Sequence, residues 1–307
     1  MKHTCKTATL LLVACLLTAP VAAQQPAPSG NNPPADEGQQ KMREGRHAEA
    51  LAYYKKVLAD TPNSYQANNQ AGVALDLLGQ YEEARKHFDK AIAAAPDAEA
   101  RSRATRNMAM SYAFSRDCAG AAKYQGPLVD EAITAGKMTD AAGIANELAR
   151  VCLESGDVDR AADWYKKGYD AAMKQEGLTP AQKDLWDFRW EHAQARIAAR
   201  RGNAAEAQTH VAAAKAILDK GTNTEQTPFL SYLTGYVAFY GGDYKTAVAD
   251  FGKANQEDPF NVCMIAQAYE KLGDTAKASE YYKKALTSNA HNPTNAYARP
   301  IAMKKAS

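Results

Sequence analysis

The stretch YQANNQAGVALDLLGQYEEARKHFDKAIAAAP, residues 65–96, decides the fold of this chain. Two segments rich in Ala, Leu, Glu and Lys flank Leu78-Gly79-Gln80, and neither alternates apolar with polar residues as a half-buried strand does. Gly79 stands where a helix can end in a left-handed conformation, which glycine adopts without strain. The stretch therefore predicts two helices joined by a tight turn.

Similar turns recur along the chain, each between two further Ala-rich segments that read as helices. Six of the seven turns contain Gly, and four follow it with Asp or Asn, which can cap the next helix. The turns are Glu44-Gly45-Arg46, Leu78-Gly79-Gln80, Ser115-Arg116-Asp117, Ser155-Gly156-Asp157, Arg201-Gly202-Asn203, Gly241-Gly242-Asp243 and Leu272-Gly273-Asp274. The chain is expected to be all-α, with seven helix-turn-helix units.

This pattern resembles the tetratricopeptide-repeat (TPR) family, whose 34-residue unit packs a helix A against a helix B. The family's small position in helix A falls on Gly38, Gly72, Ala109, Ala149, Ala195, Gly235 and Ala266. Its characteristic Ala in helix B falls on Ala50, Ala84, Ala121, Ala161, Ala207, Ala247 and Ala278. A larger side chain at either position would hold the two helices apart. The resemblance implies a right-handed α-solenoid.

The middle of the array departs from the family pattern. Successive turns are 34, 37, 40, 46, 40 and 31 residues apart, so the middle units have longer helices or inserted loops. The bulky helix B position is filled by Tyr54, Phe88, Tyr165, Phe251 and Tyr282, but by Gln125 and Val211 in two middle units. We expect about seven TPR-like units over residues 36–290, divergent in units three to five, and a C-terminal cap or tail over 291–307.

The first residues read as a secretory signal peptide. Lys2 and Lys6 form a basic start, an apolar run follows, and Val21-Ala22-Ala23 offers a small-residue cleavage site. Residues 1–23 are therefore predicted to be the signal, and residues 24–35 a flexible Pro-rich linker. The chain is expected to be exported, periplasmic or secreted.

An alternative interpretation of this segment is a lipoprotein signal. Leu12-Val13-Ala14-Cys15 resembles the bacterial lipobox, whose Cys is acylated and becomes the new amino terminus. The apolar pair Leu16-Leu17 disfavours this interpretation, because a polar tether usually follows such a cysteine. An outer-membrane lipoprotein remains the second alternative for the location.

Charge and motifs exclude several classes of function. Loss of residues 1–23 removes two of the 37 basic residues and none of the 35 acidic ones, leaving a formal charge of zero. A neutral chain is a poor nucleic-acid binder, and the mature chain has no run long enough to span a membrane. No phosphate-binding, zinc-protease or nucleophile-elbow motif is present. We predict no enzyme activity, no cofactor and no metal.

The mature cysteines are Cys118, Cys152 and Cys263, without metal-type spacing. Cys118 begins helix B of unit three, and Cys152 lies late in helix A of unit four, so both sit near the same end of adjacent helices. A disulfide between them is one interpretation, and two small buried apolar residues are the other.

The resemblance also implies where a ligand would bind, since TPR proteins usually hold ligands in a concave groove lined by helix A. The groove positions of unit six are four aromatic residues on one helical stripe. Units three to five add mainly basic side chains. The candidate peptide-binding residues are Phe229, Tyr232, Tyr236, Phe239, Arg189, His192, Arg196, Arg103, Arg106, Asn146 and Arg150. Alternatively, the aromatic rings pack on a neighbouring helix and the arginines form a solvated face.

These observations predict an exported scaffold or adaptor that binds a protein or extended peptide, whose acidic groups or free carboxylate the arginines would pair. The alternative is a structural subunit of an envelope assembly machine. The sequence does not specify an oligomeric state.

Overall fold

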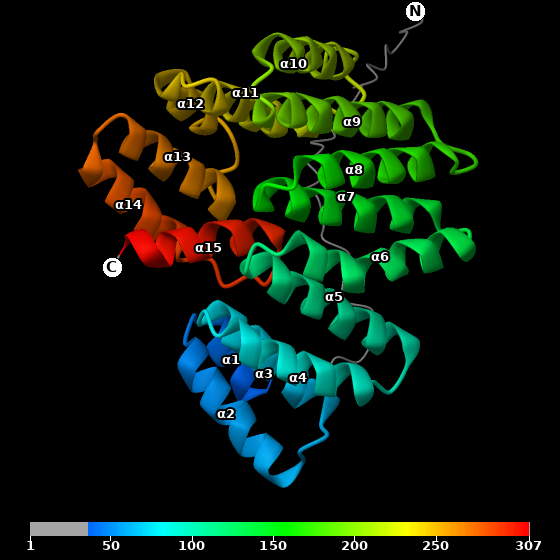
Figure 1. Cartoon of the computed structure of the whole chain (residues 1–307), viewed down its shortest axis with the longest axis vertical. Coiled ribbons are helices and arrows are strands. Elements are labelled where there is room, and N and C mark those ends of the chain that lie inside the picture. Colours follow the sequence, from blue (N-terminus) through cyan, green and yellow to red (C-terminus); the bar gives the residue numbers. More distant parts are fainter. Residues whose placement is uncertain (1–35, 307) are drawn as a thin grey trace, which may run out of the picture. The chain divides into compact units, whose positions relative to one another are not determined.

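The computed structural model describes residues 36–306, and the predicted signal peptide and linker lie outside these described residues. Within them the chain forms α-helices and one short 3₁₀ helix and contains no strand (Figure 1). The first four units are α1 (Glu37–Arg43) with α2 (His47–Asp60), α3 (Tyr65–Leu77) with α4 (Tyr81–Ala93), α5 (Ala98–Phe114) with α6 (Cys118–Thr134), and α7 (Met138–Ser155) with α8 (Val158–Met173).

The remaining units follow the same alternation. They are α9 (Pro180–Arg200) with α10 (Ala204–Leu218), α11 (Thr227–Tyr240) with α12 (Tyr244–Phe251), and α13 (Pro259–Lys271) with α14 (Thr275–Ala285). The 3₁₀ helix η1 (Thr224–Gln226) precedes α11, and a last helix, α15 (Pro293–Lys305), follows the seventh unit. Consecutive helices pack on one another throughout, which confirms the predicted all-α solenoid of helix pairs.

All seven turns adopt a left-handed conformation, which was predicted for the six that contain Gly. Their central residues are Gly45, Gly79, Arg116, Gly156, Gly202, Gly242 and Gly273, with φ between 58° and 98°. Arg116 is the one non-glycine residue with positive φ among the described residues. The acidic or amide residue after five of these turns accepts a hydrogen bond from the first turn of the next helix, so turn and cap act together.

Small residues of helix A pack against large aromatic residues of helix B. A Cβ atom added to Gly72 would lie 2.6 Å from the Phe88 ring, and one added to Gly235 would lie 2.7 Å from the Phe251 ring. Real Cβ atoms do not approach so closely, so only glycine allows these rings to occupy the space between the helices. The predicted small and bulky positions are thus two halves of one contact.

The C-terminal segment is more than the solvating cap expected from the sequence. Helix α15 covers α13 and α14, but it also packs on α5 and α7, the A helices of units three and four (Figure 1). Tyr297 and its neighbours Ala296 and Ala298 are buried there. Helix α15 is not left in solvent, because its apolar residues lie on one face and pack on apolar residues of the helices on both sides of it.

Polar contacts extend this connection to the first two units. Arg299 Nε donates to the carbonyl oxygen of Leu77 at 2.6 Å, and Asn289 Nδ2 donates to that of Arg43 at 3.0 Å. His291 Nε2 lies 2.8 Å from Asp76 Oδ2. In most solenoids each repeat contacts only its neighbours. Here residues 289–305 connect the last unit with units one to four.

Candidate functional site

One cavity of about 350 Å³ collects arginine side chains from separate helices. Arg150 comes from α7, His192 and Arg196 from α9, and Pro228, Phe229 and Tyr232 from α11. The wall is completed by the connection from α12 to α13. We call this the arginine cavity, and its lining residues are Arg150, His192, Arg196, Pro228, Phe229, Tyr232, Lys253, Ala254, Asn255, Asp258 and Asn261.

The repeat architecture places these residues together. Helices α7, α9 and α11 are the A helices of units four, five and six, and α11 packs on α9. Helix α12 has only eight residues, so its unit ends early and the chain turns back beside α11. Asp258 then caps α13, accepting hydrogen bonds from Phe260 N at 2.8 Å and Asn261 N at 3.3 Å. The connection that follows this short helix forms part of the cavity wall.

Arg150 is surrounded by aromatic rings. Its Cζ atom lies 5.7 Å from the ring centre of Tyr232, 5.6 Å from that of Phe260 and 5.9 Å from that of Tyr297. These distances suit cation–π attraction, which holds the guanidinium without neutralising its charge. Arg150 has no ion pair of 4.0 Å or less within residues 36–306.

Arg196 is held from one side only. Its Nη2 atom donates to Tyr165 Oη at 2.8 Å and its Nε atom to the His192 carbonyl oxygen at 3.3 Å. Its Nη1 atom is buried and has no hydrogen-bond partner in the described structure. A buried donor without a partner costs free energy that a bound acceptor would recover.

His192 is a neutral member of the cavity wall. Burial, followed by the charges of Arg196 and Arg150, holds the pKa of His192 well below its usual value of 6.5. Its Nε2 atom donates to the Phe229 carbonyl oxygen at 3.2 Å, and its ring stacks on that of Tyr232 with centres 5.9 Å apart. These contacts fix the backbone that carries Phe229, whose side chain is 50% exposed at the rim.

The structure separates the predicted groove residues into several groups. Phe229, Tyr232, His192, Arg196 and Arg150 line the arginine cavity. Arg103 and Arg106 line a different, polar cleft between α5 and the start of α15, where Arg106 pairs with Glu147 at 3.1 Å.

Four predicted groove residues lie elsewhere. The expectation that Tyr236 faces an open groove is corrected, because its ring is fully buried and its hydroxyl donates to Glu154 Oε1 at 3.1 Å. Phe239 packs on the ring of Tyr244, and Arg189 stacks on Trp186. Asn146 packs beside Gly168. Of the four aromatic residues of unit six, Phe229 and Tyr232 therefore line the cavity, whereas Tyr236 and Phe239 pack against other side chains.

Sequence reasoning missed Lys253, Asn255, Asp258 and Asn261, which complete the cavity. The first three lie in the connection between units six and seven, and Asn261 lies in the first turn of α13, where counting helix A positions assigns no groove residue. The sequence offered one signal, Asp258-Pro259, a frequent start of a helix, which marks the end of this connection.

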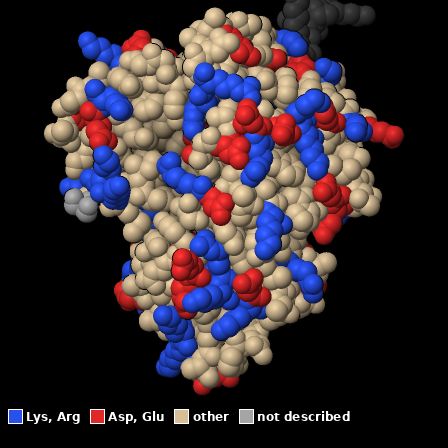
Figure 2. All heavy atoms as spheres, in the orientation of Figure 1, with Lys and Arg blue, Asp and Glu red and all other residues tan. Residues whose placement is uncertain are grey.

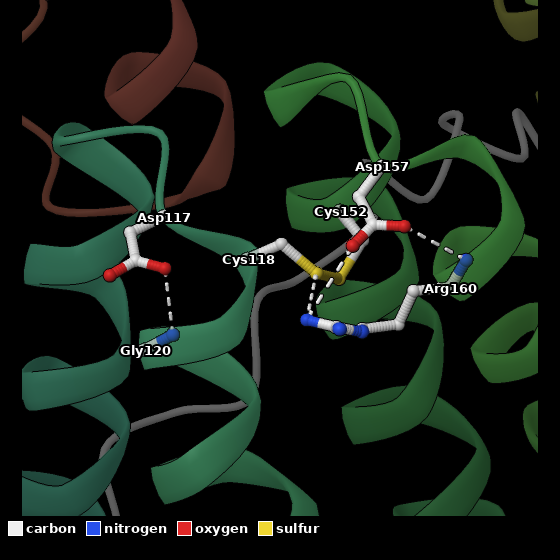
Figure 3. The surroundings of a disulfide bond; sticks show 6 residues. All are labelled: Asp117, Cys118, Gly120, Cys152, Asp157 and Arg160. Carbon is white, nitrogen blue, oxygen red and sulfur yellow. Dashed lines mark hydrogen bonds and ion pairs between the residues drawn. A yellow bond between two sulfur atoms is a disulfide. The ribbon is translucent and has the colours of Figure 1, made fainter.

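Cys118 and Cys152 form a disulfide in the structure, with their Cα atoms 4.6 Å apart (Figure 3). The guanidinium of Arg160 approaches Cys118 Sγ to 3.8 Å from α8 and pairs with Asp157. Closing a loop over a sequence separation of 34 residues stabilises the fold by about 4 kcal/mol in the chain-entropy account. The bridge fixes α6 against α7, the helix that carries Arg150. Cys263 is buried and free.

Charged residues of both signs are interleaved on the face shown in Figure 2, over α4 to α9, without a large area of one sign. Among residues 36–306, no three His, Cys, Asp or Glu side chains gather as a metal site. No helix in this range combines the length and apolar character that crossing a bilayer requires.

Comparison with protein families matches three tetratricopeptide-repeat profiles, to residues 41–106, 106–176 and 262–292. Together these matches cover just over half of the chain. The chain belongs to the tetratricopeptide-repeat family. A comparison with curated protein sequences finds no match.

One solved structure shows the same fold. A tetratricopeptide repeat protein from Parabacteroides merdae aligns over 81% of this chain and 90% of its own, with a TM-score of 0.51 and 13% identity. A signal-transduction ATPase with a tetratricopeptide repeat sensor, from Pyrococcus horikoshii, aligns over 87% of this chain and 42% of its own, with a TM-score of 0.39 and 16% identity. Proteins of this fold are in general scaffolds for protein interactions rather than enzymes.

Proposed function

We propose that this chain is an exported scaffold or adaptor that binds a protein partner through the arginine cavity. The observation that carries the proposal is the pair Arg150 and Arg196, two guanidinium groups on a cavity wall without a carboxylate paired to either in the described structure. The exposed ring of Phe229 supplies an apolar contact at the mouth. Arginine and aromatic residues are enriched among those that anchor a partner.

The position of α15 narrows the kind of complex. This helix lies on the A helices of units three, four and seven, where an extended peptide would follow the solenoid. A partner would therefore insert a short segment into the arginine cavity instead of running along several units. The formal charge of +2, which becomes zero on removal of residues 1–23, and the mixed surface of Figure 2 support a protein rather than a nucleic acid as the partner.

The proposed location is the periplasm or the cell exterior. The signal-like residues 1–23 support it, and so does the disulfide, since such bonds persist in oxidising compartments. Mass spectrometry of the mature protein tests this location. A chain that begins at Gln24 agrees with the proposal, an acylated Cys15 indicates a lipoprotein, and an intact residue 1 contradicts export.

Partner capture by the mature chain tests the binding proposal. Phe229→Glu replaces the apolar ring at the cavity mouth with a carboxylate. We expect this variant to capture no partner. Leu272→Glu is the matched control, because Leu272 is a comparably exposed apolar residue, 39% exposed, outside the cavity. Loss of capture in both variants, or in neither, contradicts the proposal.

A further inference from the structure

Four side chains that line the arginine cavity each have one buried polar atom without a hydrogen-bond partner within residues 36–306. These atoms are Arg150 Nε, Arg196 Nη1, Tyr232 Oη and Asn261 Oδ1. Three belong to groups that can donate a hydrogen bond. Buried donors are usually satisfied, so three unsatisfied donors around one cavity indicate that an acceptor binds there. A carboxylate offers two acceptor oxygens and pairs well with guanidinium groups.

The charges around the cavity favour a single negative charge. Three arginines, Arg150, Arg196 and Arg200, stand against two carboxylates, Glu154 and Asp258; both carboxylates act on Arg150, and Glu154 is paired with Arg200 at 3.2 Å. Lys253 is paired with Asp250 at 2.9 Å, and the depressed pKa of His192 keeps its ring neutral at pH 7. One positive charge is left uncompensated, which a monoanion would balance and a phosphate dianion would exceed.

Part of the cavity wall is apolar. Pro228, Phe229 and Ala254 line it, and the half-exposed Phe229 ring stands at the mouth. A volume of about 350 Å³ lies at the small end of the range for ligand sites. It holds one carboxylate with one neighbouring apolar group and has no room for several residues of an extended chain.

We infer that the arginine cavity binds a carboxylate that carries an adjacent apolar side group. Such a group is either the carboxyl-terminal residue of the partner or a free organic acid of the same size. The first source rests on the proposed function and the second does not. In both cases Arg150 and Arg196 hold the carboxylate, the Tyr232 hydroxyl donates to it, and Phe229 contacts the apolar group.

Calorimetric titration of the mature chain tests this inference with two matched pairs of ligands. One pair is N-acetylphenylalanine and its amide, and the other is a tetrapeptide ending in phenylalanine with a free or an amidated terminus. We expect each acid to bind at least about tenfold more tightly than its amide, because the amide cannot pair with the guanidinium groups. Inorganic phosphate should compete weakly or not at all.

Tyr232→Phe is the most informative variant, because it removes only a hydroxyl that lacks a partner. It should leave the melting temperature unchanged or raise it, and weaken acid binding several-fold. Tyr297→Phe is the control, since the Tyr297 hydroxyl is also buried and unpartnered but lies outside the cavity lining, and it should leave binding unchanged. Arg196→Met should abolish the preference for acid over amide.

Each outcome decides between the two claims. Binding of both acids, or of either acid alone, supports a carboxylate site. If only the free small acid binds, the carboxylate inference stands and the proposed capture of a partner by this cavity fails. Equal binding of acid and amide, tighter binding of phosphate, or no binding of any ligand overturns the inference. In the last case the partner-capture experiment still decides the proposed function.

Discussion

Replacing Arg299 with methionine tests how α15 stabilises the array. Arg299 donates three hydrogen bonds to carbonyl oxygens, from Nε to Leu77 and from Nη1 to Leu286 and Ser288. Leu77 ends α3 in the second unit, whereas Leu286 and Ser288 follow the seventh. Methionine keeps much of the aliphatic stem and removes every donor, so the variant separates these polar contacts from apolar packing.

The expected loss of stability follows from these contacts. A hydrogen bond to a charged group contributes about 1.5–3 kcal/mol, and the three bonds share one partly buried guanidinium, so their effects do not add in full. Removing the guanidinium also removes the free-energy cost of burying its charge, which offsets part of the loss. We expect the free energy of unfolding to fall by about 3 kcal/mol at pH 7.

Urea denaturation followed by circular dichroism measures this loss. Arg101→Met is the control, because Arg101 is exposed on α5 and its replacement should change the free energy by less than ~0.5 kcal/mol. A second readout is the pKa of His47, held at about 4 by burial and by the nearby Arg299 charge, which should rise in Arg299→Met. A stability change below ~1 kcal/mol with an unchanged His47 pKa would refute the account of this connection.

Three further predictions concern packing, backbone and pH. Gly235→Ala should lower the free energy of unfolding by about 1–3 kcal/mol, because the new methyl group meets the Phe251 ring. Gly143→Ala should raise it by about 0.5–1 kcal/mol, because its methyl group has no neighbour within 4 Å. Equal effects of the two variants in denaturation would contradict this account of the packing. Arg116→Gly should raise the melting temperature, because φ of 58° strains any residue with a Cβ, and an unchanged value would argue against that strain. Since the pKa of buried His47 falls to about 4, the unfolded chain takes up a proton below pH 6.5 that the folded chain refuses, so stability should drop by about 1.4 kcal/mol per pH unit down to pH 4. His47→Gln should flatten this part of the stability–pH curve, and an unaltered slope would assign the effect to other groups.

The fold was predictable from the sequence because its determinants are local. Glycine at a left-handed turn and small residues at fixed offsets from it depend on a few consecutive residues, and Gly72 and Ala84 show this in the second unit. Arg116, which stands where the other turns have Gly, also lies at the centre of an expected turn. The same regularity placed Cys118 and Cys152 near one another, although it left their bonding open.

The candidate site was only partly predictable because it depends on contacts between distant segments. Counting positions put Tyr232 and Tyr236 on one stripe, but Tyr236 is buried by Glu154 and Arg200 from other units. Asp258 and Asn261 reach the cavity only because α12 is short. Nothing in the tail sequence HNPTNAYARP indicated that Tyr297 would lie under Arg150.

Photo-crosslinking in the producing cells tests the central claim most directly. A photoreactive amino acid replaces Phe229 at the mouth of the arginine cavity, and the same residue replaces Leu272 in a parallel chain. We predict that light joins position 229 to one partner, through a segment that mass spectrometry places at the partner's carboxyl terminus. The same adduct from position 272, or no adduct from position 229, would contradict a binding site in the arginine cavity.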